Sequence, residues 1–302
     1  MDLKHKEFIN KALQELKGIF GIEGTASQNN RELIMTTFMH IVSYQYDDRE
    51  PINKTDEEIL EIARRTTKRD TPDSNVGKIL RCRPEDAQRL NILHEDTSEE
   101  GRKKWSIEFS KFILEKTRNA ICHGCFIIND DDTITIDNTN PNNPFKITYQ
   151  FDCLCDVCKE LANKEQLKYY EELLGSLKEG KPISFEDSKN KLIYFDLLVN
   201  LLVSYNEQEV YSEEFVNKFN ELTGSNFNLQ QIKHIRNSVT HHYRCFMEDN
   251  EDEICILDYR DKNRDRISSN FNLNFDKIID FSRSFNIESV YEILQSGDTV
   301  RE

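Results

Sequence analysis

The sequence has no long uninterrupted apolar stretch. Its most apolar segment, LIYFDLLVNLLV at 192–203, is short and contains Asp196 and Asn200. A membrane-spanning helix needs about 20 apolar residues, so we expect this segment to be a buried helix instead. The N-terminal residues MDLKHKEFINKALQELKGIF show a charged amphipathic pattern rather than a secretory signal peptide. We therefore expect a cytoplasmic protein with no membrane partner, in which all eight cysteines are reduced.

The sequence also lacks the short motifs that mark common cofactor sites. It has no glycine-rich phosphate-binding loop, no dinucleotide fingerprint and no metalloprotease helix. The acidic clusters at 129–132 and 248–253 lack the spacing of a calcium-binding loop and suit solvated turns better. We expect no cofactor and no bound metal.

One metal alternative stays open, a zinc site built from two C-x-x-C pairs. Its four ligands would be Cys122, Cys125, Cys155 and Cys158. A packing role suits these cysteines better, because they fall at a helix end and within a predicted helix, where buried cysteine behaves as a small hydrophobic residue.

Positive charge is scarce. The chain has 302 residues and a formal net charge of −15, whereas proteins that bind duplex nucleic acid without sequence preference usually present a basic surface. This acidity argues against a general duplex binder but not against a small local RNA site. Basic residues are in excess between Glu61 and Leu90, in a segment that suits either a polyanion backbone or an ordinary solvated helix. The candidate RNA contacts in it are Arg64, Arg65, Lys68 and Arg69.

Apolar residues recur mainly with helical spacing, which predicts a mainly α fold. We expect helices over about 3–20, 29–46, 55–68, 84–93, 103–123, 152–178, 185–204, 211–223, 228–242 and 274–295. Alternating apolar residues predict two β-hairpins, over 125–137 and 244–259, and FKITYQF after the first is a candidate third strand. The segment KEGKP is the best linker, so we expect two domains, 1–180 and 181–302.

The pattern Arg-Asn-x-x-x-His occurs twice. RNAICH occupies 118–123 and RNSVTH occupies 236–241, so the copies lie 118 residues apart, and each ends a helix before a hairpin. The next helix begins with FDCLCD in the first half and FDKIID in the second, at an offset of 124. This repeated order of helix, hairpin and helix indicates an internal duplication.

Each copy places groups suited to phosphodiester chemistry at a helix end. Arginine stays charged and offers a fork of donors for phosphate, and histidine transfers protons near neutral pH. The Asn lies one turn before the His, where its side chain can orient the ring. His242 also follows the second Arg at a suitable distance, but it aligns with Gly124. The candidate catalytic residues are Arg118, His123, Arg236 and His241, supported by Asn119 and Asn237.

The two motifs resemble the Arg-x(4–6)-His signature of the HEPN superfamily. Their RNxxxH form occurs in abortive-infection and toxin nucleases and in the RNA-cutting effectors of type VI CRISPR systems. The resemblance implies two HEPN-like helical bundles in tandem. The small β-hairpin expected after each motif helix is an addition that the general HEPN pattern does not require. It also implies an internal pseudo-dimer in which two Arg/His sets face one cleft. A homodimer, and a regulatory, guide or antitoxin partner, stay open.

The resemblance further implies a metal-independent endoribonuclease that cuts single-stranded RNA or tRNA, in antiviral defence or as a toxin. One His would take the proton of the 2′-hydroxyl and the other would protonate the leaving 5′-oxygen. The expected products are a 2′,3′-cyclic phosphate and a 5′-hydroxyl. The alternative is a non-catalytic HEPN-like module that binds RNA, a nucleotide or a protein. His234 shares a helix face with His241 and could assist the cleft, but no partner is evident in the sequence, and we expect it to pack or face solvent.

Overall fold

The structure is a computed structural model of the chain, and only part of it is described here. The described residues are 3–28, 30–45, 55, 57–58, 84–86, 88, 95–131, 133–138, 144–161, 164–203, 213–240, 244–247, 250–259 and 267–285. His241, His242 and the candidate RNA contacts Arg64, Arg65, Lys68 and Arg69 lie outside these residues. Most of the helices expected over 55–68 and 84–93 also lie outside them.

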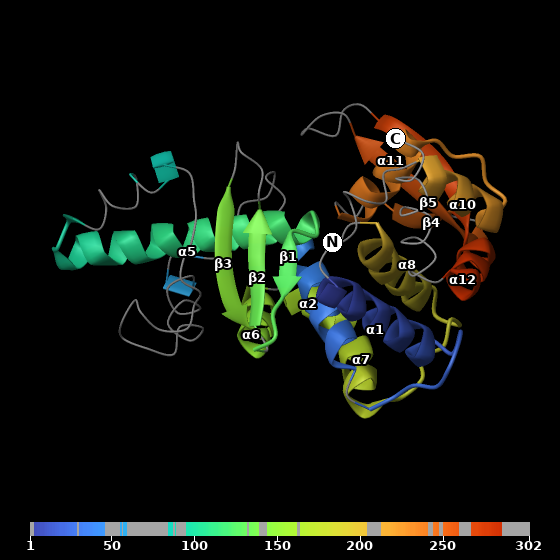
Figure 1. Ribbon diagram of the computed structural model, residues 1–302, viewed down its shortest axis with the longest axis horizontal. Coiled ribbons are helices and arrows are strands. Elements are labelled where there is room, and N and C mark those ends of the chain that lie inside the picture. Colours follow the sequence, from blue (N-terminus) through green and yellow to red (C-terminus); the bar gives the residue numbers. More distant parts are fainter. Residues whose placement is uncertain are drawn as a thin grey trace, which may run out of the picture. The chain divides into compact units, whose positions relative to one another are not determined.

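The described chain is mostly helical and carries two small antiparallel sheets (Figure 1), which confirms the mainly α prediction. The helices are α1 (Leu3–Ile19), α2 (Arg31–Gln45), α5 (Glu99–Cys122), α6 (Phe151–Leu161), α7 (Lys164–Glu179), α8 (Ser188–Leu202), α10 (Glu213–Thr223), α11 (Leu229–Thr240) and α12 (Phe275–Ser284). The strands are β1 (Phe126–Ile128), β2 (Thr133–Asn138), β3 (Phe145–Gln150), β4 (Arg244–Met247), β5 (Asn250–Tyr259) and β6 (Ile267–Asn274). No helix among these described segments is both long and apolar enough to cross a membrane.

Each motif helix is followed by a three-stranded sheet rather than by a hairpin alone. The strand orders are β1-β2-β3 and β4-β5-β6. The candidate third strand of the first half is β3, whereas β6 occupies a segment that we expected to be a polar loop and the start of the last helix. In β6 the apolar residues Phe271 and Leu273 alternate with Asn270, Asn272 and Asn274, so only one face of the strand is apolar. Asparagine is depleted in strands, which hides this pattern.

Two predicted helices also differ from the observed ones. The segment 152–178 forms two helices, α6 and α7, instead of one. The last helix, expected over 274–295, ends at Ser284, because Phe285 has extended backbone angles of φ −92° and ψ 122°. Residues 286–302 lie outside the described part of the chain.

The chain divides into two compact units. The first contains Met1–His5 and Ile41–Leu167, and the second contains Lys6–His40 and Lys168–Glu302. This division differs from the expected domains 1–180 and 181–302, because most of α1 packs with the C-terminal half. The Phe20 ring stacks on Phe185 at a centroid distance of 5.1 Å, and the Ile183 N–H donates to the carbonyl of Ile19 at 2.7 Å. The two motif copies nevertheless lie in different units.

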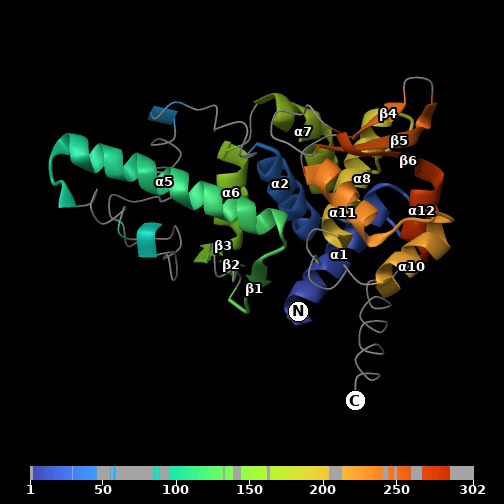
Figure 2. The same cartoon turned by 90° about the horizontal axis from the view of Figure 1, so that it is seen from above.

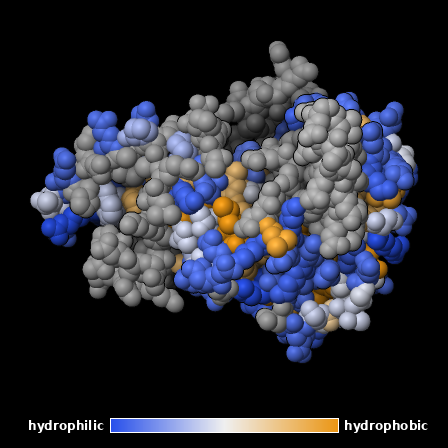
Figure 3. Space-filling model, viewed as in Figure 1, coloured by the Kyte–Doolittle hydropathy of each residue, from blue (hydrophilic) through white to orange (hydrophobic). Residues whose placement is uncertain are grey.

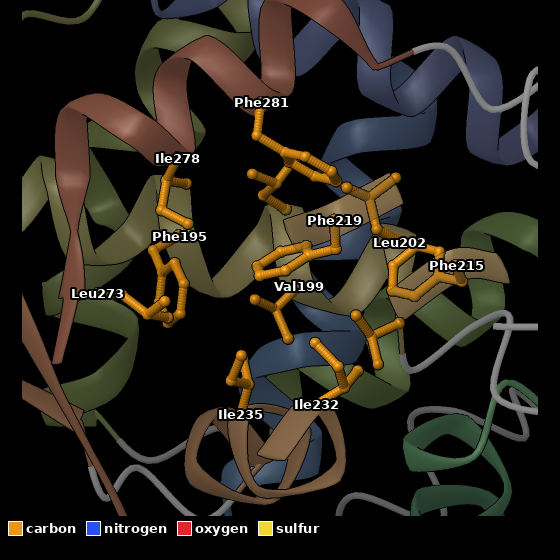
Figure 4. A pocket seen from close by; sticks show the side chains of 12 residues that line it. Phe195, Val199, Leu202, Phe215, Phe219, Ile232, Ile235, Leu273, Ile278 and Phe281 are labelled. Carbon is orange, nitrogen blue, oxygen red and sulfur yellow. The ribbon is translucent and has the colours of Figure 1, made fainter. Parts of the chain in front are cut away.

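The core of the second unit surrounds α8, where α10, α11 and α12 bring their apolar faces together (Figure 4). A cavity of about 20 Å³ lies among side chains that are all apolar. A space of that size without polar groups stays dry and marks an imperfection of packing rather than a ligand site. Ile232 and Ile235 of α11 reach into this cluster. The cluster therefore fixes which face of the second motif helix is buried.

Hydrophilic side chains cover most of the described surface on the face shown in Figure 3. This distribution agrees with a chain in which 31% of residues are charged. The apolar residues are instead concentrated in the two unit cores, where Phe195 and Ile235 in the second unit and Phe145 and Ile147 in the first are buried.

Candidate functional site

The first motif occupies the C-terminal end of α5, which stops at a glycine. The N–H of Gly124 donates to the carbonyl of Ile121 at 3.0 Å, and the N–H of Cys125 donates to Ala120 at 2.8 Å. These two bonds and a φ of +62° at Gly124 form a Schellman helix end. His123 is the C-cap residue, and it is exposed. Its backbone is therefore held in one conformation while its ring faces the surface.

Arg118 lies one turn earlier and is buried, with 7% of its surface exposed. Its Nη1 donates to Oδ1 of Asn119 at 3.0 Å. The same helix turn is tied to the sheet by Thr117, whose hydroxyl lies 3.0 Å from the Tyr149 hydroxyl. Burial raises the pKa of Tyr149, so this phenol stays neutral, and the Thr117 hydrogen bond opposes the shift only in part. The arginine therefore lies on a turn of α5 that a side-chain hydrogen bond ties to β3.

The second motif repeats this arrangement at the end of α11. Arg236 is again 7% exposed, and its Nη1 donates to Oδ1 of Asn237 at 3.1 Å. The burial classes of 117–122 and 235–240 agree at every position, with only the Asn half-buried. In both copies, therefore, an observed partner of the Asn is the neighbouring Arg. The predicted contact of Asn237 with His241 stays a prediction, because His241 lies outside the described residues.

The strand pairing that follows each motif helix is the same in both halves. The strands of the two sheets correspond at fixed offsets along the chain: 118 residues from β1 to β4, 120 from β2 to β5, and 124 from β3 to β6. At these offsets, every residue pair of the first sheet has an equivalent pair in the second. For example, Phe126, Ile136 and Ile147 lie side by side across the first sheet. Their equivalents in the second sheet are Arg244, Ile256 and Phe271. The offset of 124 then holds at the first residues of the next helices, Phe151 and Phe275. This agreement supports the predicted internal duplication beyond the motif itself.

The second copy carries a polar network that the motif pattern does not include. His234 Nδ1 donates to Oδ2 of Asp258 at 2.5 Å, and Nδ2 of Asn237 donates to the same oxygen at 3.1 Å. Nε2 of Gln230 lies 3.4 Å from Nε2 of His234. The motif residue Asn237 thus joins Arg236 to a buried carboxylate on β5, against which α11 packs (Figure 2).

The equivalent positions in the first copy hold different residues. Lys116 stands where the second copy has His234, and Asn138 stands where it has Asp258. Lys116 is buried and its Nζ lies 3.8 Å from Oδ2 of Asp86. The two copies therefore share the Arg–Asn pair but differ in the charged groups around it.

His234 is largely buried, as expected for a packed side chain, but it also has a partner that the sequence did not reveal, because Asp258 lies 24 residues further along the chain. The sequence also does not point to a partner for His40, which is buried with Nδ1 2.5 Å from Nδ2 of Asn200 and Nε2 3.5 Å from Oδ2 of Asp196. A usable signal was present in the sequence. Asp196 and Asn200, one turn apart in an apolar helix, need a buried polar partner.

The cysteines give no support to the zinc alternative. In the part of the chain that the structure describes, no three His, Cys, Asp or Glu side chains are grouped so that they could hold a metal ion. Burial, with Cys155 nearby, raises the pKa of the Cys158 thiol well above its usual value. Cys158 is buried, with 1% of its surface exposed, and it lies in the core as an apolar residue would.

Comparison of the chain with models of protein families, with curated proteins and with solved structures finds no match. The resemblance to HEPN proteins therefore depends on the two motifs and on the repeat to which they belong.

Proposed function

We propose that this chain is a metal-independent endoribonuclease in which two Arg/His sets act together on one RNA phosphate. The observation that carries the proposal is the structural equivalence of the two motif copies. Both place Arg118 or Arg236 in the same buried position with the same hydrogen bond to the next residue. A chance repeat of three letters would not be expected to reproduce burial, hydrogen bonding and strand register together.

The residue types define the chemistry. One of His123 and His241 accepts the proton of a 2′-hydroxyl, which attacks the adjacent phosphorus, and the other donates a proton to the departing 5′-oxygen. The Arg118 and Arg236 guanidinium groups neutralise the charge that develops on the phosphoryl oxygens. The proposed products are a 2′,3′-cyclic phosphate and a 5′-hydroxyl.

The acidity of the chain limits the range of RNA substrates that could bind. A net charge of −15 repels bulk nucleic acid, so the proposed substrate is a short single-stranded segment or tRNA loop that reaches a small site. A role in antiviral defence or as a toxin, with a regulatory, guide or antitoxin partner, follows from the HEPN resemblance alone.

A second candidate function, a non-catalytic HEPN-like module that binds RNA, a nucleotide or a protein, has one observation in its favour. Both motif arginines are 7% exposed and already donate to an Asn side chain. Such a pair also suits a purely structural role at the end of a helix. Binding of RNA without any cleavage would favour this function over the proposed one.

The test is cleavage of total cellular RNA by the purified chain in excess EDTA, beside the double variant His123→Ala, His241→Ala. We expect the unmodified protein to produce fragments whose 3′ ends are cyclic phosphates, as read by mass spectrometry, and the double variant to produce none. Cleavage that requires a divalent metal, or equal cleavage by the double variant, would contradict the proposal.

A further inference from the structure

We propose that Asp258 is a positioning residue of the second motif, which orients His234 directly and Arg236 through Asn237. The expected effect of Asp258 on kcat rests on the proposed ribonuclease activity, whereas its expected effect on the His234 and Arg236 side chains does not.

The proposal starts from one carboxylate oxygen that accepts two hydrogen bonds. Oδ2 of Asp258 lies 2.5 Å from Nδ1 of His234 and 3.1 Å from Nδ2 of Asn237. The other end of the same amide, Oδ1 of Asn237, accepts from Nη1 of Arg236 at 3.1 Å. Asp258 is 7% exposed, and hydrogen bonds to a buried carboxylate are stronger than those between neutral groups. The contacts therefore form a continuous chain from β5 to the guanidinium.

The geometry of α11 explains why these groups meet. Gln230, His234 and Asn237 are spaced by four and three residues, so they share one face of the helix. Ile232 and Ile235 point into the apolar cluster on another face (Figure 4). Packing of those two residues turns the polar stripe toward β5, against which α11 packs.

The hydrogen bond to Asp258 also sets the chemistry of the His234 ring. A neutral ring that donates from Nδ1 carries its acceptor on Nε2, which is the nitrogen near Gln230. His234 is thereby held in one tautomer. The first copy cannot form the same His–Asp hydrogen bond, because Lys116 and Asn138 occupy the equivalent positions.

The structural test is a long-range ¹H–¹⁵N NMR spectrum of the histidine rings in the whole chain, with His234 assigned from a His234→Gln variant. We expect neutral His234 in the unmodified protein to be the Nδ1–H tautomer, and Asp258→Asn to shift it toward Nε2–H. The Arg236 side-chain signals should shift in the same variant. An Nε2–H tautomer in the unmodified protein, or unchanged His234 and Arg236 signals in the variant, would overturn the proposal.

The kinetic test compares Asp258→Asn with Asp137→Asn on a single-stranded RNA in EDTA. Asp137 also lies near the end of a middle strand, but its carboxylate pairs with Lys146 at 2.7 Å, so it serves as a matched control. We expect Asp258→Asn to lower kcat by about tenfold to hundredfold because misplaced groups react slowly, with KM within about twofold and the control unchanged. Equal kcat in Asp258→Asn and in the unmodified protein would overturn the positioning role.

A double variant distinguishes a loss of positioning from a loss of folding. His234→Gln with Asp258→Asn leaves two neutral polar side chains that can hydrogen-bond to each other, so no buried charge is left unpaired. We expect it to retain the circular dichroism of the unmodified protein while kcat falls as in Asp258→Asn, and undiminished kcat in this folded variant would overturn the proposal. If the unmodified protein cleaves no RNA at all, the proposed function fails, and the NMR result alone decides the role of Asp258.

Discussion

The two motif copies differ less in the motif than in what surrounds it. Arg118 and Arg236 have the same exposure and the same Asn partner. Around them, the first copy has a glycine helix end, and the second has a carboxylate that holds two side chains of its motif helix. The two copies therefore agree at the arginine and its Asn neighbour and differ in the groups that surround this pair.

The largest expected effect comes from changing the shared arginines. Arg118→Lys and Arg236→Lys keep the charge but lose the planar fork of donors. We expect each to lower the rate of RNA cleavage by about 100-fold to 1,000-fold, the range found when one stabilising donor is removed from an active site. Single-turnover cleavage assays check this. A variant that keeps the full rate would show that its copy does not take part in catalysis.

Replacing the motif asparagine should lower the free energy of unfolding by different amounts in the two copies. Asn119→Ala removes the observed partner of Arg118, and we expect a loss of about 1 kcal/mol. Asn237→Ala also removes a donor from the buried Asp258 carboxylate, so we expect a larger loss of about 1–3 kcal/mol. Denaturant unfolding of both variants measures the difference, and equal losses would mean that Asp258 does not depend on Asn237.

A pH effect should distinguish the second unit from the first. Burial raises the pKa of Glu15 from its usual value of 4.5 to about 8, with Glu32 adding to the shift and the Leu33 N–H opposing it. The folded state therefore holds a proton that the unfolded chain loses, and stability falls as pH rises from about 4.5 to about 8. We expect Glu15→Gln to raise the melting temperature at pH 8 and to change it little at pH 5.

The effect of Glu15→Gln should be confined to the second unit, because Glu15, Glu32 and Leu33 all belong to it. In hydrogen exchange at pH 8, the variant should gain protection in α1 and α2 but not in α5. A gain confined to α5 would contradict the assignment.

The smallest expected effect concerns the glycine at the end of α5, whose equivalent in the second copy is His242. Gly124 has a φ of +62°, a conformation that costs other residues about 1 kcal/mol or more. We expect Gly124→Ala to lower the free energy of unfolding by about 1 kcal/mol and Gly124→Asn to lower it less, because Asn tolerates this conformation better. Thermal unfolding compares the two, and an unchanged stability in Gly124→Ala would argue against the Schellman end.

Local sequence signals predicted much of the architecture. Helical periodicity located α1, α2, α8, α10 and most of α5 and α11 within a few residues, and alternation of apolar residues located all three strands of the first sheet and two of the second. The asparagine-rich strand β6 was missed, because its apolar residues are only two in a polar segment. The single helix expected over 152–178 was wrong, and the division into units follows packing of α1 that no local pattern reveals.

The site was only partly accessible to sequence reasoning. The arginines and His123 follow from the repeated motif, and the structure adds their burial and exposure. The contact between His234 and Asp258 joins positions 24 residues apart on a helix and a strand, so it depends on strand register and on which face of α11 is buried. A motif read along the chain does not carry that information.

The most direct test of the central claim is to inactivate one copy at a time. His123→Ala and His241→Ala, each assayed on a single-stranded RNA in EDTA, remove one proton-transfer group from the proposed shared reaction. If the copies act together, each single variant loses at least about 100-fold in rate, and the double variant is little worse. If each single variant instead keeps about half of the activity, the copies work independently and the claim is wrong.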